Sequence, residues 1–163
     1  MLYIIYFTLG QNKVAVVRGF TPLEIAITGT FLFDSMLAYM LTYPLYRKVT
    51  FYTTADGKCP VAEFIDSQPA KVTQKIAWVL KAVQEIEKVP KTYFKKLSDT
   101  DFYEVRIELG GNIYRLLGFF HNGNIVILTN GFQKKTQKTP RSEIEVCEAR
   151  MKDFLTRSKE NGK

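Results

Sequence analysis

The residues best suited to chemistry in this sequence are two arginines, Arg106 and Arg115, that flank a Gly-Gly pair. Each arginine lies in a run that alternates apolar and polar residues, the pattern of a β-strand with one buried face. If Gly110-Gly111 forms a two-residue hairpin loop, the two guanidinium groups face each other across neighbouring strands. Such a pair suits bidentate contact with a phosphate. Because Glu104 and Glu108 share that polar face, a solvated ladder of arginine and glutamate is the other interpretation, and the pattern leaves both open.

A lysine-rich segment, GFQKKTQKTP, follows the next strand and spans Gly131–Pro140. Its lysines are Lys134, Lys135 and Lys138. The turn signal Asn122-Gly123, taken as a second tight hairpin, places Asn130 opposite Arg115 and the lysine-rich segment immediately beyond it. We therefore expect the first two lysines to join the two arginines at one end of the sheet, as a group of four cations that attracts phosphate.

Further candidates for contact with a nucleic acid surround this group. They are Phe132 and Tyr114 as rings for stacking, and Lys95, Lys96, Lys138 and His121 as polar contacts. Cations interleaved with aromatic rings suit single-stranded nucleic acid, which offers both phosphates and base faces. Structural roles are the alternative: core packing is favoured for Tyr114, a simple turn is favoured for His121, and Lys95 and Lys96 are otherwise solvated.

The charge of the chain is uneven. Of 23 Lys/Arg and 16 Asp/Glu residues, two of each fall within residues 1–46, so the remaining sequence carries the whole formal charge of +7. A basic surface attracts phosphate backbones, anionic membranes or acidic proteins and does not choose among them. Cys59 and Cys147 have no metal-ligand spacing, and His121 is the single histidine, so neither a zinc site nor a histidine-based triad is expected. A reducing cytoplasm is the simplest location for such a chain.

Residues 1–46 differ from the rest in being apolar and aromatic. They lack the basic start and the small-residue cleavage site of a secretory signal. The stretch Phe20–Tyr46 is long enough to span a membrane, but it contains two acids and two prolines, so no stable span is expected. Three interpretations stay open: a tail that packs on the following domain, a weakly membrane-associating segment, or upstream sequence added by a wrongly assigned start. We treat residues 1–46 as an extension and residues 47–163 as the domain.

The elements that must position the cations begin near Lys48. Strands are predicted at Val49–Thr54, Phe102–Leu109, Asn112–His121 and Asn124–Asn130, and helices at Pro60–Ser67, at Ala70–Lys88 and after the start signal Thr139-Pro140. In the longer internal helix, an apolar stripe runs through Val72, Ile76, Val79, Val83 and Ile86. Trp78 lies off that stripe and is expected to contact a neighbouring helix or a partner protein. The order strand, helix, helix, three-stranded meander, helix predicts an α+β fold.

The run YEVRIELGGNIYRLLGFFHNGNIVILTNGFQKKTQKTPRSEIEVCEAR resembles the RelE/ParE toxin superfamily. It is particularly similar to the phage-derived HigB-like branch, through its YR(I/L)L strand and its GF.KKT.KTP..EI..A ending. The likeness covers residues 47–157 and none of the first 46. It is specific because the two hairpins, the lysine-rich segment and the closing helix occur together in the expected order.

This resemblance implies a RelE-like fold, in which two N-terminal helices pack on a twisted antiparallel sheet that is followed by a C-terminal helix. It also implies a type II toxin encoded beside a helix-turn-helix antitoxin, and contact with operator DNA through the complex of the two. Relatives of this kind cut messenger RNA in the ribosomal decoding site. Their nucleophile is the ribose 2′-hydroxyl beside the scissile phosphate, and they need no metal or other cofactor.

Four residues match basic positions of that family: Arg106, Arg115, Lys134 and Lys135. Arg115 is the first candidate to hold the scissile phosphate with Arg106 beside it, while the lysines would neutralise the transition state or bind ribosomal RNA. Glu104 departs from the family pattern, where a second basic residue is usual. No histidine or tyrosine stands near the C-terminus, so the general base is left open. The rival functions are a ParE-like toxin that inhibits DNA gyrase by binding and an inactive module that only binds antitoxin.

Overall fold

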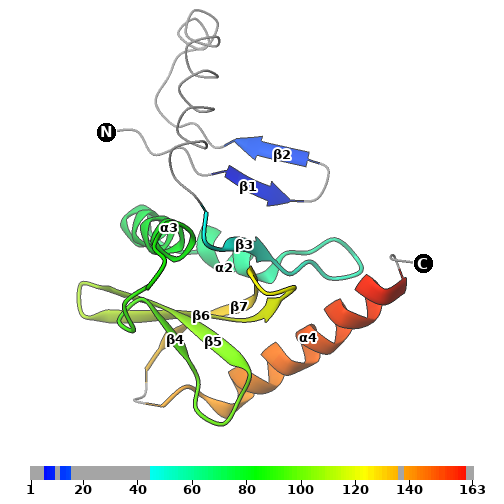
Figure 1. The fold of residues 1–163 in the computed structure, drawn as a ribbon. Helices are drawn as coiled ribbons and strands as arrows, with labels where there is room; N and C mark the ends of the chain where they lie inside the picture. Colours follow the sequence, from blue (N-terminus) through cyan, green and yellow to red (C-terminus); the bar gives the residue numbers. More distant parts are fainter. Residues whose placement is uncertain (1–5, 10–11, 16–44, 136–137, 161–163) are drawn as a thin grey trace, which may run out of the picture. The chain divides into compact units, whose positions relative to one another are not determined.

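In this computed structural model, residues 6–9, 12–15, 45–135 and 138–160 are described. The chain divides into two compact units, Met1–Leu45 and Tyr46–Lys163. The described part of the first unit is an antiparallel pair of strands, β1 (Tyr6–Leu9) and β2 (Asn12–Ala15) (Figure 1). The apolar stretch that raised the question of a membrane span lies, up to Pro44, outside the described residues. Of the helices that the structure describes, none is both long and apolar enough to cross a membrane.

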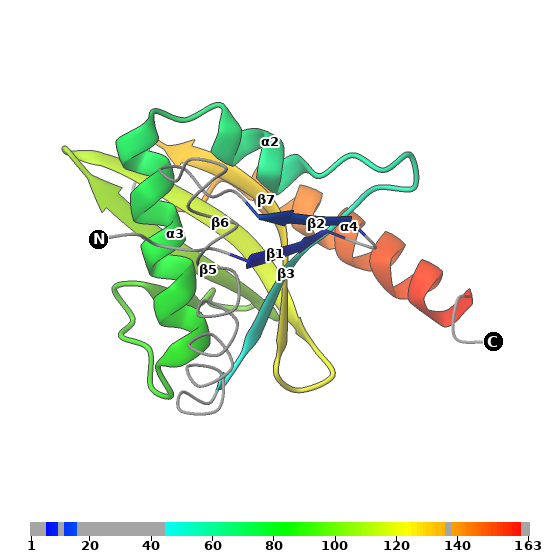
Figure 2. The same cartoon turned by 90° about the horizontal axis from the view of Figure 1, so that it is seen from above.

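The second unit is a mixed α+β domain built on one five-stranded sheet. Its strands are β3 (Lys48–Phe51), β4 (Phe94–Lys96), β5 (Phe102–Leu109), β6 (Asn112–His121) and β7 (Ile125–Lys134), in the spatial order β3-β7-β6-β5-β4. Its helices are α2 (Pro60–Asp66), α3 (Ala70–Glu85) and α4 (Arg141–Glu160). Figure 1 and Figure 2 show α2 and α3 on one face of the sheet and α4 on the other. The predicted α+β class and the C-terminal helix are confirmed.

The sheet is mixed rather than antiparallel throughout, because its edge strand β3 pairs with β7 in parallel. The register aligns Val49 with Val126 and Phe51 with Leu128, so alternate apolar side chains of both strands reach the same core. The tight turns of the meander carry no information about β3, whose partner lies far along the chain. Strand β4 was not predicted, because its three residues are too few to show a period; it pairs with β5 at the opposite edge.

Helix α3 packs most of its predicted apolar stripe against the sheet. The buried members of that stripe are Val72, Ile76, Val79 and Val83. Ile86 is instead 42% exposed, because the helix ends at Glu85 and the backbone of Ile86 is extended. Arg47 fixes this end of the helix, since its guanidinium donates to the carbonyls of Val83, Ile86 and Glu87. These bonds satisfy carbonyls that the last turn of a helix leaves without partners.

The two hairpins differ in how well their registers were predicted. The first hairpin places Arg106 opposite Arg115, as expected from the Gly-Gly turn. In the second hairpin the residue opposite Arg115 is Phe132, two positions beyond the predicted Asn130. Strand β7 consequently continues to Lys134 instead of ending before the lysine-rich segment. The sheet itself therefore carries this lysine.

Two local irregularities cause the shift in the second hairpin. Ladder pairing resumes with His121 opposite Ile125, so three residues rather than two form the loop. A β-bulge then falls between Leu117 and Gly118. A Cβ atom at Gly118 would collide with the backbone carbonyl of Ile127, so glycine permits the close approach that the bulge requires.

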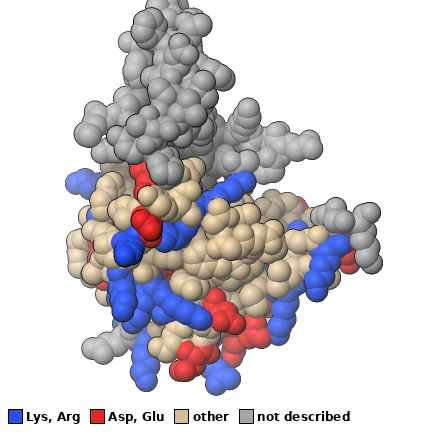
Figure 3. Space-filling model, viewed as in Figure 1, with Lys and Arg blue, Asp and Glu red and all other residues tan. Residues whose placement is uncertain are grey.

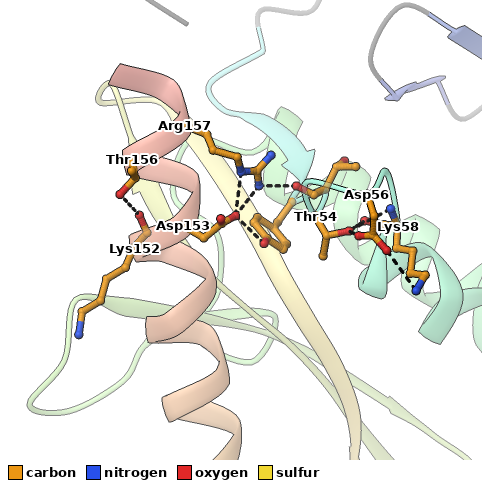
Figure 4. A network of polar contacts seen from close by, with 9 residues as sticks. Thr54, Asp56, Lys58, Lys152, Asp153, Thr156 and Arg157 are labelled. Atoms are coloured by element: carbon orange, nitrogen blue, oxygen red, sulfur yellow. Dashed lines mark hydrogen bonds and ion pairs between the residues drawn. The ribbon is translucent and has the colours of Figure 1, made fainter. Parts of the chain in front are cut away.

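Helix α4 covers a second core on its face of the sheet. Its inward residues are Ile144, Cys147, Met151 and Phe154. A polar network fixes the C-terminal end of the helix (Figure 4). The Tyr52 hydroxyl donates to Asp153 Oδ2 at 2.6 Å, and Arg157 Nε donates to the same oxygen at 2.9 Å. Arg157 also donates to the carbonyl of Thr53, so α4 is tied to the segment that leaves β3.

Candidate functional site

One group of charged side chains shares the α4 face of the sheet. Arg115 is two residues before Leu117 of the second core on β6, so the two side chains lie on the same face of the sheet. Arg106 lies opposite Arg115 on β5 and shares that face. Lys134 follows the core residue Phe132 by two positions on β7, which places it on the same face. Lys95 on β4 lies opposite Glu104, two residues before Arg106. We term Arg106, Arg115, Lys134 and Lys95 the cation cluster.

Glu104 lies between the two arginines and is 4% exposed. Its Oε1 is 3.3 Å from Arg106 Nε, and its Oε2 is 3.6 Å from Arg115 Nε. The Thr139 hydroxyl donates to Oε2 at 3.2 Å. Both arginine Nε groups are buried, and neither makes a hydrogen bond within the described part of the chain. The ladder of arginine and glutamate foreseen from the sequence therefore exists, with Arg115 and Glu104 buried, Arg106 half-buried and Glu108 exposed to solvent.

Arg115 is 1% exposed and lies beneath the surface of the cluster. Its Nη1 donates to the carbonyl of Tyr114 at 2.9 Å, and its Nη2 is 3.4 Å from Glu108 Oε1. Burial lowers the pKa of this guanidinium from its usual value, and the nearby charge of Arg106 acts in the same direction, while Glu104 and Glu108 oppose both. In this conformation Arg115 supports its neighbours and has little surface to offer a ligand.

Arg106 and Lys134 are the half-buried members of the cluster. The side chain of Arg106 is 26% exposed, and its Nη1 donates to the carbonyl of Lys91 at 3.1 Å. Burial lowers the pKa of Lys134, and the positive charges of Arg115, Arg106 and Lys95 lower it further, against the opposite effect of Glu104. The positive charges of Arg115, Arg106 and Lys95 therefore all act on Lys134, whereas the sequence led us to expect Lys135 in the place of Lys95.

Three further lysines named from the sequence, Lys135, Lys138 and Lys96, are exposed and lie outside the cation cluster. Lys135 follows Lys134 at the end of β7 and is exposed, and Lys138 is exposed beyond residues 136–137, which lie outside the described residues. Lys96 points to the other side of β4 from Lys95 and pairs with Asp101 at 3.2 Å. Of the four cations expected together, Arg106, Arg115 and Lys134 belong to the cation cluster and Lys135 does not; Lys95 is the fourth member, and Lys96 lies apart.

The two rings and the histidine proposed as RNA contacts are not at the cluster surface. Phe132 is 9% exposed and Tyr114 is 4% exposed, each packed in one of the two cores. His121 ends β6 six residues from Arg115, about 20 Å along an extended strand. Its ring meets that of Phe154 edge to face at 5.2 Å between centroids. These positions favour core packing for Tyr114 and a structural role for His121, the alternatives considered from the sequence, and they show that Phe132 is a core residue as well.

Two contacts at the site, made by Thr139 and by Asn130, were not predicted from the sequence. The Thr139-Pro140 signal indicated a helix start and gave no hint that the hydroxyl would reach Glu104. Asn130 Nδ2 donates to Glu143 Oε2 at 2.8 Å, and so joins β7 to the first turn of α4 beside the cluster. Contacts of this kind depend on the bulged register of β7, which no turn signal reports. Within the described residues, no group of three or more His, Cys, Asp or Glu side chains lies together as a metal site would require.

Comparison with known proteins adds one match. A family model described as "Phage derived protein Gp49-like (DUF891)" matches residues 63–152, more than half of the chain. The matched segment contains α3, strands β4 to β7 and the first part of α4, and with them every member of the cation cluster. No curated protein matches the chain.

Proposed function

The chain belongs to the phage-derived Gp49-like family, within a RelE/HigB-like toxin superfamily, and on that basis we propose that it is the HigB-like toxin of a type II toxin–antitoxin system. The proposed activity is ribosome-dependent cleavage of messenger RNA in the cytoplasm. Its proposed partners are a helix-turn-helix antitoxin, which brings it to operator DNA, and the ribosome with its message. The domain would then have the RelE-like arrangement, with β3 as an additional parallel edge strand.

The observation that carries the proposal is the cation cluster. Four cations from β4, β5, β6 and β7 share one face of the sheet around the buried carboxylate of Glu104, and two of them, Arg106 and Lys134, are half-buried. Cleavage through the ribose 2′-hydroxyl places an extra negative charge on the phosphorane transition state. Fixed cations in a partly dehydrated site stabilise that charge more than cations in water do.

The positions of the cations suggest a division of roles. Arg106 and Lys134 would contact the phosphate oxygens, and Lys95 and Lys135 would hold the neighbouring backbone. Arg115, the first candidate from the sequence, would act from beneath as a positioning residue, because its guanidinium is buried against Glu104 and two backbone carbonyls.

Lys134 is the best candidate for proton transfer. A lysine accepts a proton from a 2′-hydroxyl only if its own pKa is depressed, and burial together with three nearby cations depresses that of Lys134. Glu104 suits this role less well, because its side chain is buried and both of its carboxylate oxygens are engaged, by the two arginines and by the Thr139 hydroxyl.

The test is expression of the full chain as wild type, as Lys134→Ala and as Lys152→Ala, with growth followed and messenger RNA 5′ ends mapped. Lys152 is an exposed lysine on α4 that pairs with Glu148, and it serves as a matched control. We expect growth arrest with new cuts inside translated codons for the wild type and the control, and neither effect for Lys134→Ala. Arrest with intact messages and DNA damage signalling would instead indicate a ParE-like gyrase inhibitor. An absence of arrest with antitoxin binding retained would indicate an inactive module.

A further inference from the structure

The solvent side of α3 carries an exposed tryptophan among lysines. Trp78 is 42% exposed, whereas indole rings are usually largely buried. Its ring meets Tyr93 edge to face, with 5.2 Å between centroids. Lys75 Nζ lies 4.1 Å from the centre of the indole ring and 5.7 Å from that of the Tyr93 ring. Lys75, Trp78 and Tyr93 thus form a compact group, termed here the Trp78 cluster.

The Trp78 cluster and the cation cluster are joined by one short segment. Tyr93 stands directly before β4, and its carbonyl accepts a hydrogen bond from the backbone amide of Arg106 at 2.8 Å. The carbonyl of Lys91 accepts from the guanidinium of the same arginine at 3.1 Å. The next residue of this edge to face the cation cluster is Lys95. Tyr93 therefore contacts Trp78 of α3 on one side and the backbone of Arg106 on the other, and so lies between the two clusters.

Charge along this edge is predominantly positive. The acids of α3 and the loop after it are Glu85 and Glu87, whereas exposed or half-buried lysines on α3, in that loop and on β4 are Lys71, Lys75, Lys81, Lys88, Lys91, Lys95 and Lys96. Figure 3 shows Lys and Arg side chains gathered below α3, on the side of the sheet that holds β4. A partner that fits this surface must offer negative charges together with a flat ring. Single-stranded RNA supplies both, as phosphates and bases, whereas an acidic peptide supplies the charge but gives no reason for the paired rings.

We propose that Trp78 and Tyr93 form a stacking subsite for a base of the RNA strand whose scissile phosphate lies at the cation cluster. Lys75 and Lys91 bind the phosphates between the two points. This inference rests on the proposed function. In this arrangement the β4 edge and α3 hold the RNA strand, and the phosphodiester bond is cut elsewhere, at the cation cluster.

The test uses the tryptophan itself, because Trp78 is the single tryptophan of the chain. The full-length protein is titrated with a short single-stranded 2′-O-methyl oligoribonucleotide, which cannot be cut through its 2′-oxygen. We expect quenching of the intrinsic fluorescence as the base stacks on the indole. Labelled-oligonucleotide anisotropy should show that Trp78→Ala weakens binding by roughly tenfold or more and that Trp78→Phe retains part of it.

Two control variants separate stacking from general effects. Ile86→Ala removes an equally exposed apolar side chain at the end of α3 and should leave affinity unchanged. Lys75→Ala should reduce the slope of log affinity against log salt concentration by about 0.7, the value for one phosphate contact on a single strand. RNA binding without quenching, with Trp78→Ala equal to wild type, would overturn the subsite while leaving cleavage at the cation cluster intact. Quenching by the antitoxin but not by RNA would also overturn it, and would identify the surface as a protein interface.

Discussion

Glu104 compensates two arginines that would otherwise repel each other across β5 and β6. Because its carboxylate is buried with Arg115, removing the negative charge leaves this buried cation with the exposed Glu108 as its remaining acidic partner. We expect Glu104→Gln to lower the free energy of unfolding by on the order of 3 kcal/mol, even though glutamine keeps the size of the side chain and can accept from Thr139. Urea denaturation of the full chain measures this loss.

Glu108 provides the comparison for that prediction. Its side chain also pairs with Arg115, but it is 63% exposed. Glu108→Gln should therefore cost less than about 1 kcal/mol, since water screens an exposed pair. Equal losses for the two variants would mean that Glu104 does not have the central position that the structure gives it.

Lys134 should set the pH dependence of cleavage. Its pKa is lowered by burial and by the neighbouring cations, so it loses its proton at a lower pH than an ordinary lysine. If the neutral amine is the base, the cleavage rate rises with pH until this lowered pKa is passed and then levels. Arg106→Gln removes a nearby positive charge, which raises the pKa of Lys134 and moves the rising limb to higher pH.

The Lys134→Arg variant separates a proton-transfer role from a purely electrostatic one. Arginine keeps the positive charge but does not release a proton in this pH range. We expect it to retain RNA binding and to lose the rising limb. A pH–rate profile unchanged by this substitution would remove Lys134 from the proton-transfer step.

Among the secondary-structure elements, α4 is stabilised at its C-terminal end by the hydrogen bonds that attach it to the segment after β3. Tyr52→Phe removes the hydroxyl that donates to Asp153 and should cost about 1 kcal/mol, with faster amide exchange confined to the last turns of α4. Hydrogen bonds from Arg157 and Tyr52 lower the pKa of Asp153, so the contribution of this carboxylate to stability is present at neutral pH and is lost as the pH falls through that lowered pKa. Amide exchange that is uniform along α4 in Tyr52→Phe would show that the helix is held elsewhere.

The elements differ in how far the sequence determines them. The Gly110-Gly111 turn and the stripe of α3 were predictable because local geometry fixes both: a two-residue loop sets the register, and a helical period sets the buried face. The bulge at Gly118 was not predictable, because a glycine inside a strand does not say which residue is left unpaired. The parallel pairing of β3 depends on contacts between distant segments. The bulged register of the second hairpin also decides that the neighbour of the buried Arg115 on β7 is Phe132 rather than Asn130.

Because the chain divides into two compact units, we expect residues 46–163 to be sufficient both for folding and for growth arrest. This unit contains both cores, all five strands of the larger sheet and the cation cluster. Produced alone, it should unfold cooperatively in urea and arrest growth as the full chain does. A truncated protein that folds normally but no longer arrests growth would show that residues 1–45 take part in the function.

The net positive charge of the molecule makes its affinity for RNA dependent on salt concentration. Because residues 47–163 carry the whole +7, binding of single-stranded RNA should weaken steeply as salt is raised. The dependence reports the number of phosphates that lysines and arginines contact, and it should decrease when a residue of the cation cluster is neutralised.

If the cation cluster promotes cleavage of RNA by the ribose 2′-hydroxyl, the ends of the two fragments carry the chemical signature of that attack. Purified full-length protein would be incubated with ribosomes carrying a defined message, and the fragments analysed for their termini. Attack by the 2′-oxygen predicts a 2′,3′-cyclic phosphate on one fragment and a 5′-hydroxyl on the other, formed by the wild type and by Lys152→Ala but not by Lys134→Ala. Fragments with 5′-phosphates would exclude attack by the 2′-oxygen, and cleavage undiminished in Lys134→Ala would exclude the cation cluster as its site.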